Sequence, residues 1–243
     1  MEKPEIIQLG SLYFDDFPVF PGTSYNNKHL AIGDTEKGKE LEWIQYNGNL
    51  YGTYCVCLNI SWDQINDHDF VYGAKVWIDG KQYLCRCLKV GNATSVPNEW
   101  GTLMDKFGEA DSIWHWTKQL FWGQEVPEWE DGTMIARVAR GFHYANYWTS
   151  VGSDHQLPHM GFRPVLEPIT PLELSDALVG RNIKVYLPQG GFVEGLLVGS
   201  DKYDLLMDVE NAEIPTISDC AAWQGEQIVI NKNTIVDIAD KHH

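Results

Sequence analysis

Residues 141–167 read GFHYANYWTSVGSDHQLPHMGFRPVLE, and they divide into two parts of different character. The first part mixes tyrosine, tryptophan and histidine with asparagine, serine and glycine, which is the composition of a binding loop. Tyrosine offers a large contact area with few rotatable bonds, and asparagine and serine adapt their hydrogen bonds. The second part, residues 161–167, has the apolar character of a core strand. The stretch therefore predicts a buried strand preceded by a binding surface.

The aromatic residues of the loop have two interpretations. Aromatic side chains near strands are more often core or loop anchors than ligand platforms, so we expect Phe142 and Trp148 to be buried. The better surface candidates are Tyr144, Asn146, Tyr147, His155 and His159.

Short motifs rich in tryptophan, glycine and arginine precede this strand and continue into it. They are Trp114-His115-Trp116, Trp122-Gly123, Arg137-Val138-Ala139-Arg140-Gly141, Tyr147-Trp148 and Gly161-Phe162-Arg163-Pro164-Val165-Leu166. With these motifs the region resembles the C-type lectin-like fold, in the variety of formylglycine-generating enzymes and of the variable proteins of diversity-generating retroelements. It is also similar to uncharacterised prophage and mobile-element proteins, at residues 60–63 (ISWD), 98–100 (NEW) and 108–111 (GEAD).

The resemblance implies roles for the residues of the final strand. Phe162 and Val165 would pack in the core, and Arg163 would be held by backbone carbonyls or by a buried carboxylate. The loop before the strand would lie on the side of the domain that faces a ligand.

Residues 171–240 are a series of short segments separated by turn residues. The segments are NIKVYLP, GFVEGLLVGS, KYDLLMDVE, QIVIN and TIVDIAD. Before them, Thr170 and Glu173 match a helix capping box, Pro171 suits the first turn and Gly180 ends the helix. A short helix followed by five strands of this size predicts a small closed barrel.

The same region resembles Sm-like and SH3-like domains at residues 178–185 (LVGRNIKV), 195–197 (GLL) and 201–205 (DKYDL). Sm proteins that bind RNA have an asparagine where this chain has Asp204, and a carboxylate there repels phosphate. We therefore expect a barrel without the RNA function. The predicted organisation is an α+β protein with a C-type lectin-like domain at residues 1–169 and a five-stranded barrel at residues 170–243.

The remaining elements of the first region follow from local patterns. Strands are expected at residues 52–60, 72–91 and 133–142, and Asp79-Gly80 is expected to form a hairpin turn within the second of these. Ser61 with Gln64 matches a capping box, and Asn98 can cap a second helix. Residues 1–50 and 91–132 are expected to contain long irregular stretches.

Composition excludes some classes of partner. The chain has 18 lysines and arginines against 34 acidic residues, a net charge of −16. Duplex nucleic acid and anionic membranes are bound mainly by basic residues, so neither is expected as a partner, whereas a basic partner is compatible with this charge. No apolar run is long enough for a membrane helix, and no secretory signal begins the chain. The 5 cysteines are expected as free thiols in the cytoplasm.

Cysteine and histidine pairs in the chain are candidate metal ligands of an enzyme. Cys55-x-Cys57 and Cys85-x-Cys87 could place four thiols together, but zinc sites favour C-x2-C in turns, so we expect small buried hydrophobic residues instead. His155 and His159 have the spacing of a metal-ligand pair, but Gly161 stands where an acidic ligand would follow. The sequence contains no G-x-S-x-G nucleophile elbow and no glycine-rich phosphate-binding motif. No metal and no cofactor is expected.

The preferred hypothesis is a non-enzymatic binding protein of phage or mobile-element origin, with a barrel for docking or self-association. Its ligand would be a protein or a small molecule, bound by the loop before residue 161. One alternative is an anti-defence protein that sequesters a signalling nucleotide, stacking it on aromatic side chains and holding its phosphates with Arg86, Arg137 or Arg140. The other is a metal-dependent enzyme on the formylglycine-generating-enzyme scaffold.

Overall fold

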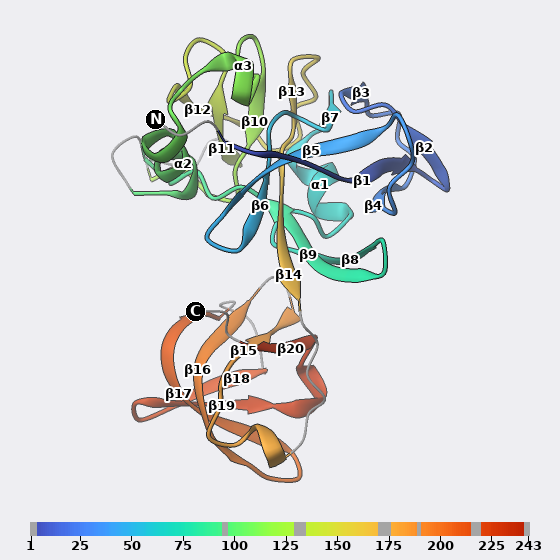
Figure 1. Ribbon diagram of the computed structural model, residues 1–243. Coiled ribbons are helices and arrows are strands. Elements are labelled where there is room, and N and C mark those ends of the chain that lie inside the picture. The colour runs from blue at the N-terminus through green and yellow to red at the C-terminus, as the bar shows by residue number, and fades with distance from the viewer. Residues whose placement is uncertain are drawn as a thin grey trace. The chain divides into compact units, whose positions relative to one another are not determined.

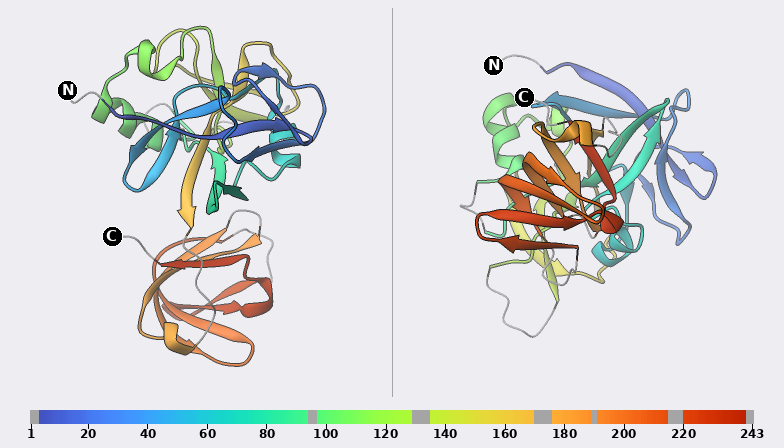
Figure 2. Two further views of the ribbon diagram at one scale, coloured as in Figure 1. Left: turned by 45° about the vertical axis from the view of Figure 1, so that its right-hand side comes forward. Right: turned by 90° about the horizontal axis from the view of Figure 1, so that it is seen from below.

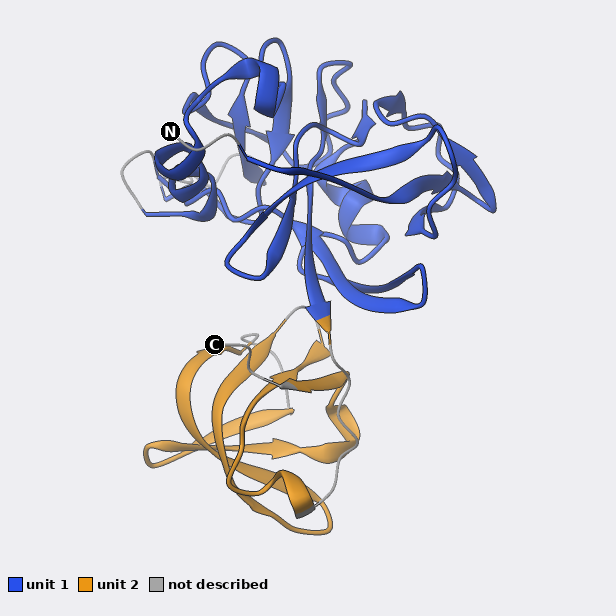
Figure 3. Ribbon diagram, viewed as in Figure 1, with its two compact units in different colours: residues 1–168 blue, residues 169–243 orange. Residues whose placement is uncertain are grey.

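The computed structural model describes residues 4–93, 97–128, 135–169, 176–188, 191–214 and 220–240. The chain divides into two compact units, residues 1–168 and residues 169–243 (Figure 3). The expected boundary between residues 169 and 170 lies one residue after this division.

The first unit contains two sheets (Figure 1). The larger one has eight strands in the order β2-β1-β5-β6-β14-β9-β8, and β4 pairs with β1 outside this path. Its strands are β1 (Ile6–Phe14), β2 (Phe17–Val19), β4 (Leu30–Gly33), β5 (Glu40–Tyr46), β6 (Asn49–Gly52), β8 (Ala74–Ile78), β9 (Lys81–Cys87) and β14 (Pro164–Ile169). The β8–β9 hairpin turns at Asp79-Gly80 as expected, with Ile78 opposite Lys81.

The second sheet of this unit has six strands in the order β12-β11-β10-β13-β7-β3. Its strands are β3 (Thr23–Ser24), β7 (Cys57–Leu58), β10 (Leu120–Trp122), β11 (Ala136–Gly141), β12 (Trp148–Gly152) and β13 (Met160–Phe162). The pairs β10–β13 and β3–β7 are parallel. Strand β13, which ends at Phe162, lies between β10 and β7, two strands that are far apart in the sequence.

Three short helices accompany these sheets, namely α1 (Trp62–Asp67), α2 (Glu99–Phe107) and α3 (Asp111–Trp114). The predicted capping box at the start of α1 is confirmed, because Ser61 and Gln64 bond each other's backbone amides. Asn98 also caps α2 as expected, since its side chain accepts a hydrogen bond from the Gly101 amide at 2.8 Å.

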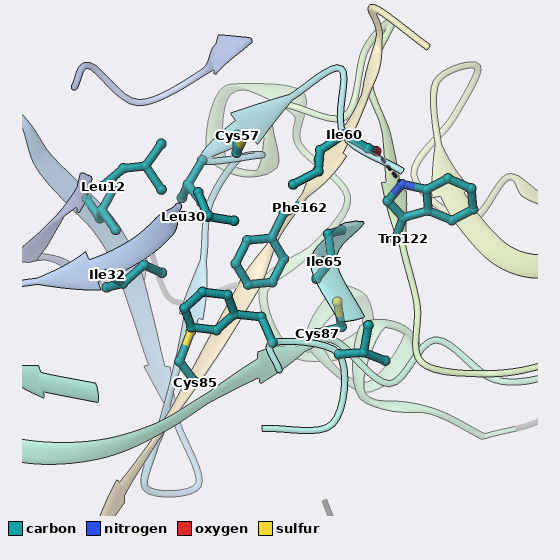
Figure 4. Packing of buried hydrophobic residues seen from close by; sticks show 14 of the residues in the cluster. Leu12, Leu30, Ile32, Cys57, Ile60, Ile65, Cys85, Cys87, Trp122 and Phe162 are labelled. Atoms are coloured by element: carbon teal, nitrogen blue, oxygen red, sulfur yellow. Dashed lines mark hydrogen bonds between the residues drawn. The ribbon is translucent and has the colours of Figure 1, made fainter. Parts of the chain in front are cut away.

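The core of the first unit surrounds the segment that the opening stretch predicts as one strand, which is divided at Arg163 into β13 and β14 of two different sheets. Phe162 is fully buried among apolar side chains (Figure 4). Its ring lies 5.5 Å from that of Phe70 between centroids, and Val165 is also fully buried. Gly161 lies so close to the neighbouring strand that a Cβ atom there would stand 2.3 Å from the carbonyl oxygen of Cys57. The predicted core roles of Phe162 and Val165 are therefore confirmed.

The second unit is one six-stranded sheet in the order β18-β19-β17-β16-β15-β20. Its strands are β15 (Asn182–Tyr186), β16 (Phe192–Ser200), β17 (Asp204–Glu213), β18 (Ala221–Gln224), β19 (Gln227–Asn231) and β20 (Asp237–Asp240). Figure 2 shows the sheet curving around its interior as a half-barrel. Two 3-10 turns, Asp176–Leu178 and Lys232–Thr234, complete the described part of this unit.

The predicted fold class is wrong in two respects. Strands make up 50% of the structure and helices 12%, so the protein is mostly β and not α+β. The five-stranded closed barrel is a half-barrel of six strands, in which no described residue of β18 pairs with β20. The predicted capping box of Thr170 and Glu173 lies outside the described residues.

The strand content was underestimated mainly in residues 1–50, which hold β1 to β5 and the start of β6. A bulge between Gln8 and Ser11 shifts the register of β1 against β5, and Gly10 there has a φ of 69°. A bulge moves later side chains to the other face, so the strand loses the two-residue alternation by which it would be recognised.

Three rings connect the end of α1 to the loop between β3 and β4. The Tyr25 hydroxyl lies 2.9 Å from Nε2 of His68, and the rings of His29 and His68 lie 5.2 Å apart between centroids. Burial, and then the neighbouring His29, lower the pKa of His68 below its ordinary value of 6.5, while Asp67 and Asp69 oppose that shift. The folded protein therefore favours the neutral imidazole.

Acidification is expected to weaken this contact. Because the unfolded chain binds a proton at His68 more readily than the folded chain, this stabilisation is complete above pH 6.5 and is lost as the pH falls through the lowered pKa. Hydrogen exchange at about pH 8 and about pH 5 should show faster opening of residues 25–29 at the lower pH, after correction for intrinsic rates. A His68→Gln variant should lose this extra pH dependence. Equal pH dependence in both proteins would contradict the prediction.

Candidate functional site

Five aromatic rings form a continuous series, which we call the aromatic ladder; four of them lie on the loop after β11, and the fifth, His159, lies just before β13. The successive centroid distances are 4.9 Å from His159 to Phe142, 4.8 Å from Phe142 to His143, 4.8 Å from His143 to Tyr147 and 5.6 Å from Tyr147 to Tyr144. Three of these contacts are edge-to-face, the arrangement that the ring quadrupoles favour. The ladder therefore holds several rings in fixed mutual orientations.

The backbone beneath the ladder has an unusual conformation. Phe142 has a φ of 78°, in the left-handed region that a bulky side chain rarely adopts, and it follows Gly141 with a φ of 99°. Two hydrogen bonds hold Phe142 to one loop, because its amide donates to the Trp116 carbonyl at 2.9 Å and its carbonyl accepts from the Lys118 amide at 3.0 Å. Backbone strain of this kind persists only where surrounding contacts enforce it, and it gathers at functional sites.

Side chains from neighbouring elements fix the loop from below. Trp100 of α2 donates from Nε1 to the carbonyl of Ala145 at 2.8 Å, and Arg140 of β11 donates to the carbonyl of Asn146 at 3.1 Å. The Asn146 side chain donates to the Glu109 carboxylate at 2.6 Å. A loop anchored at two consecutive carbonyls loses little conformational entropy when a partner binds to it.

The structure brings three of the five loop candidates into the ladder. Tyr144 is 55% exposed, whereas Tyr147 and His159 are half-buried, each presenting part of its ring. Asn146 is half-buried and positions the loop through Glu109. His155 is exposed on the loop before β13, where the described residues include no ring partner for it. The expected burial of Phe142 and Trp148 is only partial.

The three candidate arginines form contacts within the fold. Arg86 is 4% exposed and forms ion pairs with Glu99 and Glu167, each at 2.6 Å. Arg140 is 2% exposed and donates twice to the Val90 carbonyl, at 2.7 and 3.1 Å.

Arg137 is the third candidate arginine, and it packs against an aromatic ring. Its guanidinium carbon lies 4.1 Å from the ring centroid of Trp62, and its Nη1 donates to the carbonyl of Ala136. All three candidate arginines thus contact carboxylates, backbone carbonyls or an aromatic ring of the fold itself.

The paired cysteines are buried free thiols. Burial raises the pKa of Cys55 to about 11 and raises the pKa values of Cys57, Cys85 and Cys87 further, so all four are protonated at neutral pH. Metal ligation and nucleophilic attack both require the thiolate. Within the described residues, no three histidine, cysteine or acidic side chains are grouped as metal ligands.

Comparison with known proteins gives no relative. No family model matches the chain, and no curated protein and no solved structure matches it either. The resemblance to the C-type lectin-like fold thus stays a prediction. No helix among the described ranges is long and apolar enough to cross a membrane.

Two ladder residues were not among the sequence-based candidates, Phe142 and His143. The sequence placed Phe142 in the core because large aromatic residues are usually buried there. The only sequence signal for its position is the preceding glycine, which permits the turn at Gly141 but does not predict a positive φ at the next residue.

Proposed function

We propose that the first unit is a non-catalytic binding domain that recognises a protein partner through the aromatic ladder. The observation that carries this proposal is the fixed series of partly exposed rings on a strained, anchored loop. Rigid tyrosines are the side chains that most often dominate protein interfaces, because they bury a large area at a small entropic cost.

The shape of the site favours a macromolecular partner. None of the ladder residues lines either of two cavities, of about 490 and 400 Å³, in the described part of the first unit. Small ligands are usually enclosed in a concave site, whereas protein interfaces are broader and flatter. The net charge of −16 further favours a basic partner surface.

The nucleotide-sequestering alternative lacks its expected phosphate anchors. Arg86 and Arg140 are buried in contacts with carboxylates and carbonyls, and Arg137 is stacked on Trp62. A phosphate would have to displace these contacts. Phage or mobile-element origin, an anti-defence role and self-association through the second unit stay predictions.

Peptide selection with the whole chain as bait tests the proposal. Peptides enriched from a random library should bind at the ladder, and Tyr144→Ala should weaken them about tenfold or more, since truncation of a central aromatic residue costs 2 kcal/mol or more at an interface. Tyr147→Ala should act similarly, with some loss of stability because its ring is half-buried. Binding can be measured by titration calorimetry.

The matched control is Tyr203→Ala in the second unit, because Tyr203 is 57% exposed against 55% for Tyr144. This control should leave peptide affinity unchanged. If the enriched peptides bind Tyr144→Ala and Tyr147→Ala as well as the unaltered chain, the ladder is not the recognition surface.

A further inference from the structure

A cavity of about 400 Å³, open to solvent, lies in the first unit. Its lining comes from four separate parts of the first unit: Pro21, Gly22, Glu42, Tyr54, Cys55, His115 and Gln119. The proposed protein-binding surface does not use it. Because distant segments supply its walls, the cavity is a product of the tertiary fold and not of one local loop.

The charged group of this cavity is Glu42 of β5. Its carboxylate forms no ion pair with any residue in the described ranges, although other half-buried carboxylates such as Glu99 and Glu167 are paired with an arginine. Burial raises the pKa of the nearby Tyr54 to about 12, and the charge of Glu42 is the next contribution. The carboxylate therefore acts on the tyrosine that forms the adjoining wall.

The walls beside Glu42 are aromatic. The rings of Tyr54 and His115 lie edge-to-face with their centroids 6.0 Å apart. The Tyr54 hydroxyl bonds back to the carbonyl of Glu40 at 3.4 Å, which keeps the ring in place. His115 has a φ of 45°, and its amide donates to the Asp111 carbonyl at 2.8 Å, so α3 fixes its position. Planar π surfaces beside a carboxylate attract a flat cation.

The remaining polar groups are neutral. Cys55 is a protonated thiol, because burial raises its pKa to about 11. The Oε1 atom of the Gln119 side chain is buried and has no hydrogen-bond partner among the described residues. An unsatisfied buried amide oxygen is costly, so a donor that reached it would bind favourably.

We propose that this cavity binds a guanidinium group, with Glu42 as its carboxylate partner and Tyr54 and His115 as its aromatic walls. A guanidinium is planar, carries several N–H donors and pairs with a carboxylate through two parallel hydrogen bonds while its face stacks on a ring. The donors that Glu42 leaves unused are available to other acceptors of the lining, among which the Gln119 amide oxygen has no partner in the described residues.

Other ligand classes fit the lining less well. An ammonium ion is a compact, strongly hydrated charge that cannot stack or form the bidentate pair. An anion would meet the Glu42 carboxylate, and the lining contains no lysine or arginine to offset it. A neutral apolar ligand would bury the Glu42 carboxylate without a partner, which is unfavourable.

The cavity is lined by a loop that also bonds the ladder, so both a free compound and a peptide side chain are sources of guanidinium to test. Residues 115–119 supply His115 and Gln119 to the cavity, and the same loop bonds Phe142 of the ladder through Trp116 and Lys118. The group can be a small free guanidine compound or the arginine side chain of a peptide. Neither source requires that the ladder itself bind anything.

Heteronuclear NMR titration of the whole chain tests the proposal. The probes are agmatine and a blocked pentapeptide with a central arginine. The controls are two pentapeptides in which lysine or uncharged citrulline replaces the arginine. Millimolar agmatine or arginine peptide should shift the signals of Tyr54, His115 and the Gln119 side-chain amide. The lysine and citrulline peptides should bind about tenfold or more weakly, because each loses charge-assisted hydrogen bonds.

Protein variants assign the partner. Glu42→Gln should weaken guanidinium binding about tenfold or more, whereas Glu40→Gln, the same charge change two residues away on β5 and outside the lining, should leave it unchanged. Binding of both arginine and agmatine identifies the free group as sufficient, and binding of the peptide alone identifies an arginine side chain. Absence of shifts with both probes, or equal binding of the lysine or citrulline peptide, overturns the proposal. The citrulline comparison stays decisive if Glu42→Gln fails to fold.

Discussion

Replacing Arg163 with methionine is expected to destabilise the first unit by about 3 kcal/mol. Arg163 is 1% exposed, and its guanidinium donates to the carbonyls of Thr53 at 2.9 Å, Gly52 at 3.4 Å and Trp114 at 2.6 Å. Methionine fills much of the space but donates to none of these oxygens. Each buried acceptor left unpaired costs about 1–3 kcal/mol, and relief from burying a charge offsets part of that sum.

The aromatic contacts of Arg163 add to this effect. Its guanidinium carbon lies 4.5 Å from the ring centroid of Phe121 and 5.1 Å from that of Trp100, and Trp100 in turn holds the ladder loop at Ala145. Burial lowers the pKa of Arg163 to about 10, so the side chain is still charged at neutral pH. Loss of the side chain should therefore also loosen the ladder.

Urea unfolding followed by tryptophan fluorescence measures this change. Arg181→Met is the matched control, because Arg181 is exposed and the same chemical change there should cost less than about 0.5 kcal/mol. A loss below about 1 kcal/mol for Arg163→Met would show that water or relaxation satisfies the three carbonyls, and the structural role assigned to Arg163 would be wrong.

The interior position of Arg163 could be predicted from the sequence, but the elements around it could be predicted only in part. The family resemblance implied an arginine held by backbone carbonyls or by a buried carboxylate, and the structure contains the first of these two arrangements. Local signals at Ser61, Asn98 and Asp79-Gly80 also identified two helix starts and a turn. These signals depend on neighbouring residues alone, so they survive without knowledge of the fold.

Other features needed information beyond local pattern. Asn47-Gly48 joins β5 to β6 as a two-residue turn and is the strongest hairpin signal in residues 1–50. The other neighbour of β5 is β1, and the bulge at Gly10 obscured the strand pattern of β1. Strand β18 was missed because its sequence, AAWQ, is short and weak in β-branched residues.

The candidate site could likewise be predicted only in part from the sequence. The composition of residues 141–167 indicated a binding loop, and Tyr144, Tyr147 and His159 do lie in one series of rings. The order of that series depends on the positive φ of Phe142, which three-dimensional contacts impose. Glu42 and His115 approach each other only through the fold, so no spacing in the sequence could have joined them.

Replacing Arg86 with methionine is expected to destabilise the first unit by about 3–5 kcal/mol, the usual cost of removing one partner from a buried ion pair. Arg86 of β9 is enclosed between Glu99 of α2 and Glu167 of β14, and it donates to both carboxylates. Its own pKa is raised well above the ordinary value because the attraction of Glu167 and Glu99 outweighs the effect of burial. Without the guanidinium, two carboxylates that are 20% and 13% exposed would lose the positive charge between them.

The buried ion pairs of Arg86 need not add net stability to the fold. A series of variants separates the effect of losing the arginine charge from the effect of losing the packing of its side chain. Adding Glu167→Gln and then Glu99→Gln to Arg86→Met removes the two negative charges one at a time, so stability should recover at each step. Glu99 also accepts a hydrogen bond from the Lys89 amide at 2.9 Å, and the glutamine side-chain oxygen can replace that contact. Recovery to within about 1–2 kcal/mol of the unaltered chain in urea unfolding would show that the arginine neutralises the carboxylates that connect α2 and β14. If the triple variant were no more stable than Arg86→Met alone, the loss would come from packing of the arginine stem, and the electrostatic explanation would be wrong.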